Sequence, residues 1–368
     1  MGLTTSSFLI SNIKINIAVM LKKNKACLEN ESVSLSINLN GGSINDFKLK
    51  TTGINPLSFI YPKDLMPSNN KNGATYQGHF LCLGRWGEPS SGEKNAGLPD
   101  HGQFANILWE KIISTKDGYI EMQAKSILEG LKINREVYLD PSFPIYLVKE
   151  QVVNFNALGR LFSMVQHPTI AAPFLDNKIT VDCNATVGFD QCNFKNIASN
   201  TIQWKQQNID LHYKKINTDF NHRTDIVQSY IVDQKSTYGW ITAYNPTSNI
   251  LIGYMWPRKD YPWIHIWEHV KEGNLIYMGL EFGDTAIHQP FHDILNTPHL
   301  FSEKAVGYID SGETIEKKYI SFMITPPQEF NGVFDIIIEN EKIKLITKKD
   351  IINISFTENS SFLYELST

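Results

Sequence analysis

Two histidines and one glutamate lie beside apolar runs, where acid–base chemistry would need them. His101 lies in GLPDHGQFANILWE, His167 in SMVQHPTIAAPF and Glu281 in MGLEFGDTAIHQPF. Imidazole and carboxylate groups can both be tuned toward neutral pH, so such a set can move protons without a metal or a redox cofactor. Each residue also fits a structural role, as a loop-capping histidine, a satisfied loop histidine or a strand-end carboxylate with a basic neighbour. Because an unpartnered buried carboxylate is costly, Glu281 needs a reason to follow a buried strand.

The stretch WIHIWEH (263–269) contains His-x-x-Glu-His, the ligand order of the inverted zinc-peptidase motif. That chemistry needs a helix, whereas the preceding Pro262 and the alternation of aromatic and β-branched residues predict a strand. A strand places one set of side chains on a single face, namely Trp263, His265, Trp267 and His269. The sequence therefore argues against zinc, and the stripe either stacks against a sugar ring or packs a sheet.

The composition excludes several classes of protein. The chain has 368 residues, 34 Lys plus Arg against 38 Asp plus Glu, and a net charge of −4 without a long run of one sign, so a nucleic-acid or acidic-membrane surface is not indicated. No apolar stretch reaches the ~18 residues of a membrane-spanning helix, and the N-terminus makes a poor signal peptide. We expect a soluble, cytoplasmic protein, with the periplasm left open. The four cysteines show no metal-binding or disulfide-scaffold spacing.

Period-two alternation dominates the chain and predicts an all-β fold. It is clear in SVSLSINL before an NGG turn, in LKINREVYL, in IYLVKEQVVNF and in YGWITAYN. Hardly any window has helical spacing, and 62–100 is expected to be one long loop, either functional or poorly ordered. We expect an N-terminal extension over 1–28 and one antiparallel β domain over 29–368.

Four segments in order carry a resemblance to a known family. They are DHGQFANILWE, LKINREVYLDPSFPIYLVKEQVVNFNALGRLFSMVQHP, TAYNPTSNILIGYMWPRKDYPWIHIW and GLEFGDTAIHQPF. Together they resemble the galactose mutarotase (aldose 1-epimerase) superfamily, which includes hexose-6-phosphate epimerases. The resemblance lies in order and spacing, and covers roughly residues 30–325. It implies a large antiparallel β-supersandwich with the site on the concave face of its central sheet.

The resemblance also implies roles for individual residues. His167 matches the general acid that protonates the ring oxygen, and Glu281 the general base that takes the proton of the anomeric hydroxyl. His101 matches a histidine that holds sugar hydroxyls, and Arg85 in LCLGRWGEP matches a substrate-binding arginine. The substrate-binding aspartate is best matched by Asp225, with Asp219 and Asp233 as alternatives. If WIHIWEH is a strand of the concave sheet, His265 or Trp267 should line the pocket that holds Glu281.

The function expected from this resemblance is the interconversion of the anomers of a hexose or related sugar, by ring opening on the His167–Glu281 pair. Two alternatives stay open: a non-catalytic carbohydrate-binding protein of the same fold, and a hexose-6-phosphate epimerase. A lyase or hydrolase would need a second catalytic carboxylate or tyrosine near Glu281, and none is identified. The expected partner is a monosaccharide or sugar phosphate, bound by a monomer or homodimer without nucleic acid, membrane, cofactor or metal.

Overall fold

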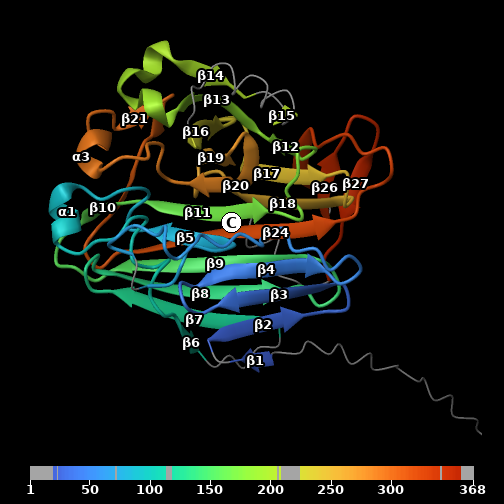
Figure 1. Cartoon of the computed structure of the whole chain (residues 1–368), viewed down its shortest axis with the longest axis horizontal. Coiled ribbons are helices and arrows are strands. Elements are labelled where there is room, and N and C mark those ends of the chain that lie inside the picture. The colour runs from blue at the N-terminus through green and yellow to red at the C-terminus, as the bar shows by residue number, and fades with distance from the viewer. Residues whose placement is uncertain are drawn as a thin grey trace, which may run out of the picture.

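The computed structural model describes residues 20–22, 24–70, 73–112, 118–204, 207–208, 224–339 and 342–357. Two large antiparallel sheets dominate these residues (Figure 1). Neighbouring strands of the eleven-stranded sheet run in the order β1 (Met20–Lys22), β2 (Lys25–Glu29), β3 (Val33–Asn38), β4 (Ser43–Leu49), β5 (His79–Leu83), β11 (Met164–Ala171), β20 (Asn274–Gly283), β19 (Trp263–Lys271), β16 (Asp225–Val232), β13 (Ala185–Asp190) and β14 (Thr201–Gln203).

The second sheet has nine strands among the described residues. Their order is β15 (Gln207–Asn208), β12 (Thr180–Cys183), β17 (Tyr238–Asn245), β18 (Ile250–Pro257), β24 (Thr314–Ile324), β9 (Ile145–Asn154), β8 (Leu131–Leu139), β7 (Tyr119–Ser126) and β6 (Glu110–Ile112). Alternating inward side chains from both sheets form the main core, as in other face-to-face sandwiches. Phe47 of β4 meets Tyr146 of β9 edge-on at 4.8 Å between ring centroids, and Trp256 of β18 stacks on Phe282 of β20 at 4.1 Å.

Smaller elements complete the described structure. The sheet of β25 (Asp335–Glu339), β26 (Lys342–Ile346) and β27 (Ile351–Ile354) packs through a second apolar cluster on the nine-stranded sheet. Two short pairs join β10 (Arg160–Phe162) to β23 (Gly307–Ile309) and β21 (His299–Leu300) to β22 (Glu303–Lys304). The helices are α1 (Ser91–Asn95), α3 (Phe291–Ile294) and the 3-10 helix η1 (Gln191–Ser199). None of the helices in the described ranges could cross a bilayer.

The all-β fold predicted from alternation is confirmed, and several strands begin and end as predicted. LKINREVYL forms β8 and YGWITAYN forms β17, and the NGG turn joins β3 to β4 with Gly41 and Gly42 at positive φ. Gly42 also lies against Trp109, where a Cβ would come within 2.4 Å of the indole ring. A side chain at this turn is therefore excluded both by the backbone angle and by the core.

Two expectations about the organisation of the chain need correction. The span 62–100 is not one loop, because HFLCL forms β5 in its middle and all five residues are buried. A run buried on both faces shows no alternation, which is why the pattern missed it. The expected boundary between residues 28 and 29 falls inside β2, which pairs with β3, so the sheet starts before that boundary. The remaining part of the expected N-terminal extension, 1–19, lies outside the described residues.

Candidate active site

The candidate site lies on the face of the eleven-stranded sheet that points away from the nine-stranded sheet. Side chains alternate along β20, so Leu280 and Phe282 enter the sandwich core while Glu281 faces outward. On the neighbouring β11, the register that pairs Gln166 with Phe282 brings His167 beside Glu281. His167 Nε2 lies 3.0 Å from Glu281 Oε1. The general acid and base implied by the resemblance are thus in direct contact, although their positions are more than a hundred residues apart in the chain.

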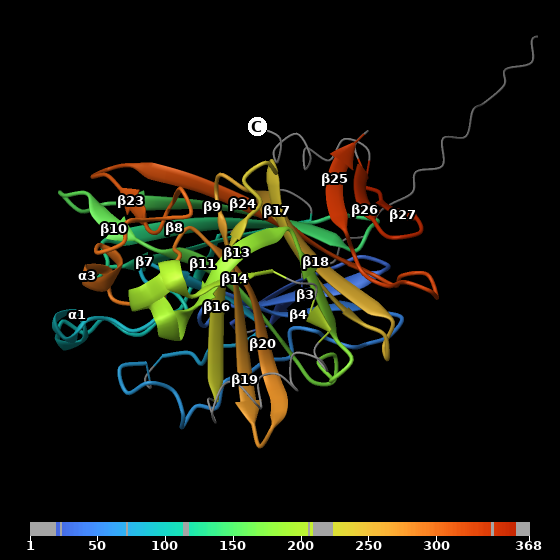
Figure 2. The same cartoon turned by 90° about the horizontal axis from the view of Figure 1, so that it is seen from above.

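The pair opens into a pocket of about 320 Å³. Figure 2 shows that β16, β19 and β20 extend on this side of the molecule next to the loops before and after β5. Most side chains of the wall are aromatic or titratable, as is usual for a small-molecule site. The lining residues are Phe59, Tyr61, Leu65, Pro67, Tyr76, Phe80, Trp86, Gly87, Glu88, Asp100, His101, His167, Asp225, Val227, Trp267, Glu281 and His288.

Glu281 is 1% exposed and has two neutral partners. Trp86 Nε1 donates to its Oε2 at 3.0 Å, and His167 contacts its Oε1. Burial raises the pKa of Glu281 well above its usual value, and the Trp86 hydrogen bond partly opposes that shift because it favours the carboxylate. Glu281 is therefore a carboxyl group poised to exchange a proton with an imidazole.

His167 is held by its other ring nitrogen and by a stacked ring. Its Nδ1 lies 2.9 Å from Thr169 Oγ1, and that hydroxyl also contacts the His167 carbonyl at 3.4 Å. Both contacts are satisfied when Nδ1 carries hydrogen, which leaves Nε2 free to accept from Glu281. Phe80 of β5 stacks on the imidazole at 4.2 Å. The pKa of His167 is lowered well below its usual value, mainly by burial and next by the nearby His101.

His101 lies in the pocket wall with its tautomer fixed by a backbone amide. The Gly87 N–H donates to His101 Nδ1 at 3.3 Å, and Cys82 Sγ lies 3.3 Å from the same nitrogen. Because an amide only donates, Nδ1 must be the bare nitrogen and Nε2 must carry the hydrogen. Burial and His288 lower the pKa of His101 to about 3. His101 is thus a neutral donor, and its φ of 60°, uncommon outside glycine, brings the ring to Gly87.

The stripe on β19 has the predicted orientation. Trp267 lines the pocket and donates from Nε1 to Asp225 Oδ1 at 2.9 Å, so the predicted aspartate lies in the same pocket. His265 lies on the same face but forms no part of the pocket lining. It is fully buried, its Nδ1 lies 2.7 Å from Ser229 Oγ, and its ring packs behind Trp86 at 4.0 Å between centroids with a tilt of 32°. His265 therefore supports the Trp86 ring from behind, and the direct contact with substrate that the sequence suggested for His265 needs correction.

Arg85 does not line the pocket, so its expected contact with substrate needs correction. Its guanidinium is buried on the opposite side of the loop, ion-paired with Glu93 and 4.5 Å from the centroid of the Phe291 ring. The alternation of β5 continues past its end: Phe80 and Trp86 both line the pocket, whereas Leu81 and Leu83 enter the sandwich core and Arg85 is directed away from the pocket. The alternative aspartate Asp233 caps a turn through Lys235 N at 3.0 Å, and Asp219 lies outside the described residues.

Sequence reasoning missed several side chains that shape the site. Trp86 adjoins Arg85, and His288 lies in GLEFGDTAIHQPF, but neither has a pattern that distinguishes it from a core residue. The His288 ring lies 4.7 Å from Trp86 and 5.6 Å from His101 between ring centroids, and the backbone N–H of His288 donates to Gln191 Oε1 at 2.9 Å. The only available signal was proximity in the chain to a predicted site residue.

Metal ligation through the His-x-x-Glu-His motif is excluded by the strand. β19 places His265 on the pocket face, whereas Glu268 pairs with Ile226 and Met278 and faces the other way. Elsewhere in the described ranges, no three side chains of the ligating types are grouped closely enough to hold an ion. The arrangement of the pocket can instead perform proton transfer between a carboxyl group, an imidazole and a bound hydroxyl.

Comparisons with known proteins agree on the fold. No family model and no curated protein matches the sequence. A galactose mutarotase-like protein from Clostridium acetobutylicum superposes with a TM-score of 0.56 at 13% identity, over 82% of this chain and 95% of that one. A galactose mutarotase related enzyme from Lactobacillus acidophilus gives 0.55 at 13%, over 82% and 97%. The chain therefore has the galactose mutarotase-like fold.

Proposed function

We propose that this chain is an aldose 1-epimerase-like isomerase that interconverts the anomers of an unphosphorylated hexose or a related sugar. The observation that carries the proposal is the contact of His167 Nε2 with Glu281 Oε1 at 3.0 Å in the wall of a pocket. Ring opening needs one group that removes the O1 proton and another that protonates the ring oxygen. These two oxygens share one carbon, so adjacent groups can reach both.

The pair holds one proton in its resting form. Burial disfavours charge on both groups, since it raises the Glu281 pKa and lowers the His167 pKa. Transfer of the shared proton from Glu281 to His167 Nε2 produces the base and the acid together. The Glu281 carboxylate then takes the O1 proton, His167 delivers its proton to the ring oxygen, the bond from C1 to the ring oxygen breaks, and the C1–O1 double bond forms. Rotation about C1–C2 and the reverse steps give the other anomer.

Other groups hold the sugar in this account. His101 donates from Nε2 to a ring hydroxyl, and the Asp225 carboxylate, fixed by Trp267, accepts from another. The described lining residues include Glu88, Asp100 and Asp225 but no lysine or arginine. A phosphate dianion would be repelled by these carboxylates, so the lining favours an uncharged sugar over a hexose 6-phosphate.

The test is an NMR exchange panel of common aldoses and their 6-phosphates. We expect catalysed exchange between the α and β anomers of at least one free aldose, and slower or no catalysis for its 6-phosphate. Sugar binding without any rate above the spontaneous background would instead identify a carbohydrate-binding protein of this fold. Catalysis confined to the phosphates would contradict the proposed substrate class.

A further inference from the structure

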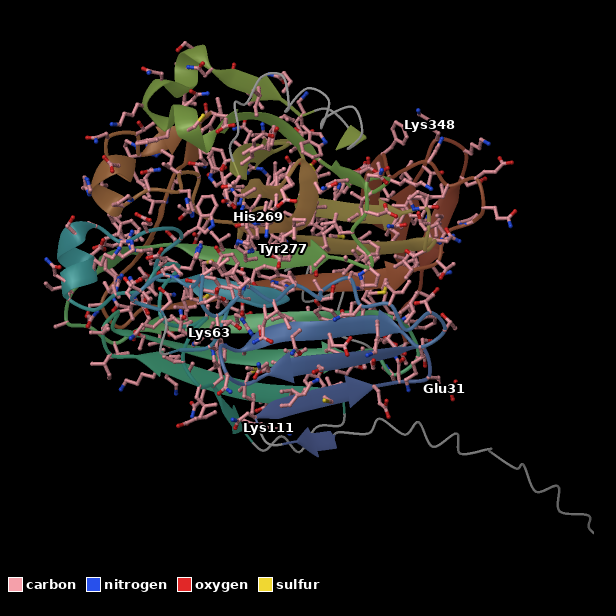
Figure 3. The ribbon with its side chains drawn as sticks, viewed as in Figure 1. Glu31, Lys63, Lys111, His269, Tyr277 and Lys348 are labelled. Atoms are coloured by element: carbon pink, nitrogen blue, oxygen red, sulfur yellow. The ribbon has the colours of Figure 1, made fainter. Side chains whose placement is uncertain are left out.

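A second cavity lies at one end of the sandwich, away from the candidate active site. It is an open groove of about 540 Å³, lined by residues 156–161, which lead from β9 into β10, by Glu93 of α1 and by Phe291 of α3. Figures 1 and 2 both show α1, β10 and α3 together at the left edge of the molecule. Figure 3 labels His269 and Tyr277, on strands of the active site, near the middle of the view. The two cavities share no described lining residue, and the groove has the volume of a small-molecule site.

The groove wall carries one cation among its described residues, the half-buried Arg160. Its Nε donates to the Leu161 carbonyl at 3.1 Å and its Nη1 to the Glu129 carbonyl, and both acceptors are neutral. Within the described part of the chain, no carboxylate forms an ion pair with this guanidinium. A partly buried cation without a counter-ion is costly, so this position favours the binding of an anion.

The two carboxyl groups nearest to Arg160 have other roles. Glu93 is ion-paired with Arg85, and its second oxygen accepts from the Ser90 N–H at 2.8 Å. Glu129 lies beneath the groove, and burial raises its pKa to about 7, so much of it is uncharged at neutral pH. Together these groups leave a small positive charge at Arg160. It can balance one negative charge on a ligand, whereas the Glu93 carboxylate would repel a dianion.

Most of the remaining groove wall is apolar. Leu158 is 78% exposed, and Leu161 and Phe291 are half-buried. The Phe291 ring is held in place by the Arg85 guanidinium, 4.5 Å from its centroid. In the same turn, the backbone N–H groups of Ala157 and Leu158 donate to no group of the described ranges. The groove thus offers apolar contact beside a cation and unused hydrogen-bond donors.

We propose that this groove binds a small organic monocarboxylate with an apolar body. The carboxylate receives hydrogen bonds from Arg160 Nη2, since Nε and Nη1 already donate to carbonyls, and the charge of both partners strengthens these bonds. The apolar body covers Leu158 and lies against Phe291. The inference does not depend on the proposed function, because no described residue of the groove belongs to the candidate active site.

The test is an NMR titration of the full chain with four probes at about pH 7.5, where a phosphate monoester is a dianion. We expect 3-phenylpropanoate to bind with a Kd of about 1 mM or tighter. The neutral 3-phenylpropan-1-ol, acetate and phenyl phosphate should each bind about 10-fold more weakly or not at all, because they lack the charge, lack the apolar body or carry a second charge.

Three variants locate the bound probe. Arg160→Met keeps the length of the side chain and removes the cation, and should weaken 3-phenylpropanoate about 10-fold. Leu158→Asp, at an exposed position that leaves the core intact, should weaken it similarly by repulsion and decides the matter if Arg160→Met fails to fold. Lys125→Met removes an exposed cation that does not line the groove, and should keep the wild-type affinity.

Several results would overturn the inference. They are equal binding of the acid and the alcohol, no binding of 3-phenylpropanoate, and wild-type affinity in either folded groove variant. Displacement of the probe by a free aldose would place it in the active site instead. Phenyl phosphate that binds as tightly as the carboxylate would contradict the proposed class of ligand.

Discussion

Gln166 and His167 are neighbours on β11, and they serve two different buried glutamates on opposite sides of the eleven-stranded sheet. Gln166 points into the sandwich core, where its Nε2 donates to Glu150 Oε2 at 2.6 Å and Arg135 Nε donates to Oε1 at 2.6 Å. His167 points the other way to Glu281. Both carboxyl groups are at most 1% exposed.

The two glutamates differ in what can happen to their protons. Both oxygens of Glu150 accept from side chains that cannot take part in proton exchange, since a guanidinium retains its proton and an amide has none to release. Glu281 has an indole N–H on one oxygen and a weak base on the other. Under the proposed function Glu281 is catalytic and Glu150 is structural, so burial alone does not distinguish the two roles. The chemistry of the partners does.

The largest effect is expected from Glu281→Gln, which keeps the shape of the side chain and removes its basicity. We expect kcat to fall by about 10²–10⁴-fold, with sugar affinity nearly intact. NMR exchange rates and a binding isotherm on the best aldose provide the check. Glu316→Gln, at a more exposed glutamate of β24, is the matched control. Full activity of the Glu281 variant would show that this carboxyl group is not the base.

On the other side of the sheet, Arg135→Met should affect stability and not chemistry. It leaves Glu150 buried without its cation, which costs about 3–5 kcal/mol. Urea unfolding measures that loss, and Arg135→Met/Glu150→Leu should recover most of it. The specific activity of the folded fraction should stay at the wild-type level. A loss below about 1 kcal/mol would mean that the Arg135–Glu150 pair contributes little to stability.

Glu129 is a third buried glutamate, and its pKa links the stability of the fold to pH. It is fully buried beneath the loop of His101, accepts from Gln103 N at 3.1 Å, and burial raises its pKa from 4.5 to about 7. Between these two pH values the folded protein keeps the proton that the unfolded chain has released. Stability therefore decreases as pH rises through this window, by about 3 kcal/mol in total. Glu129→Gln should remove this slope in unfolding free energies measured from pH 4 to 8, and an unchanged slope would exclude Glu129 as its source.

The smallest effect is expected from Trp86→Phe, which removes the N–H that donates to Glu281. That hydrogen bond favours the carboxylate, so its loss should raise the Glu281 pKa further. The basic limb of kcat against pH should then move to higher pH, because the pair keeps its shared proton longer. The rate constant kcat at neutral pH should fall about tenfold, because transfer of that proton to His167 becomes less favourable. A basic limb that does not move would mean that Trp86 acts only by packing.

Much of this arrangement was predictable from the sequence. Alternation gives the faces of β8, β17 and β19, and the resemblance brings His167, Glu281 and His101 into one pocket. These predictions succeed because period-two burial is a local property of each strand. The contact between β11 and β20 depends on a pairing across more than a hundred residues, and local pattern says nothing about its register.

The errors lie where the backbone leaves regular structure. Arg85 and Trp86 are adjacent just beyond β5, a strand that alternation did not predict, so no face could be assigned to either of them, and Trp86 is the one that enters the pocket. His265 points to the predicted face of β19, but the Trp86 side chain covers it. The alternation within a strand cannot indicate that a side chain from a distant loop packs over that strand. Loop geometry and the stacking of one layer on another are thus the parts of the site that the sequence leaves open.

The central claim is that Glu281 and His167 act as one proton relay, and a double-mutant cycle tests it most directly. NMR anomeric exchange rates would be measured for Glu281→Gln, His167→Asn and the double variant on the best free aldose. Each single variant should lose about 10²–10⁴-fold, and the double variant should lose little more than either one, because removing one member already stops the relay. Losses that multiply in the double variant would show that the two residues act independently, and would contradict the shared-proton mechanism.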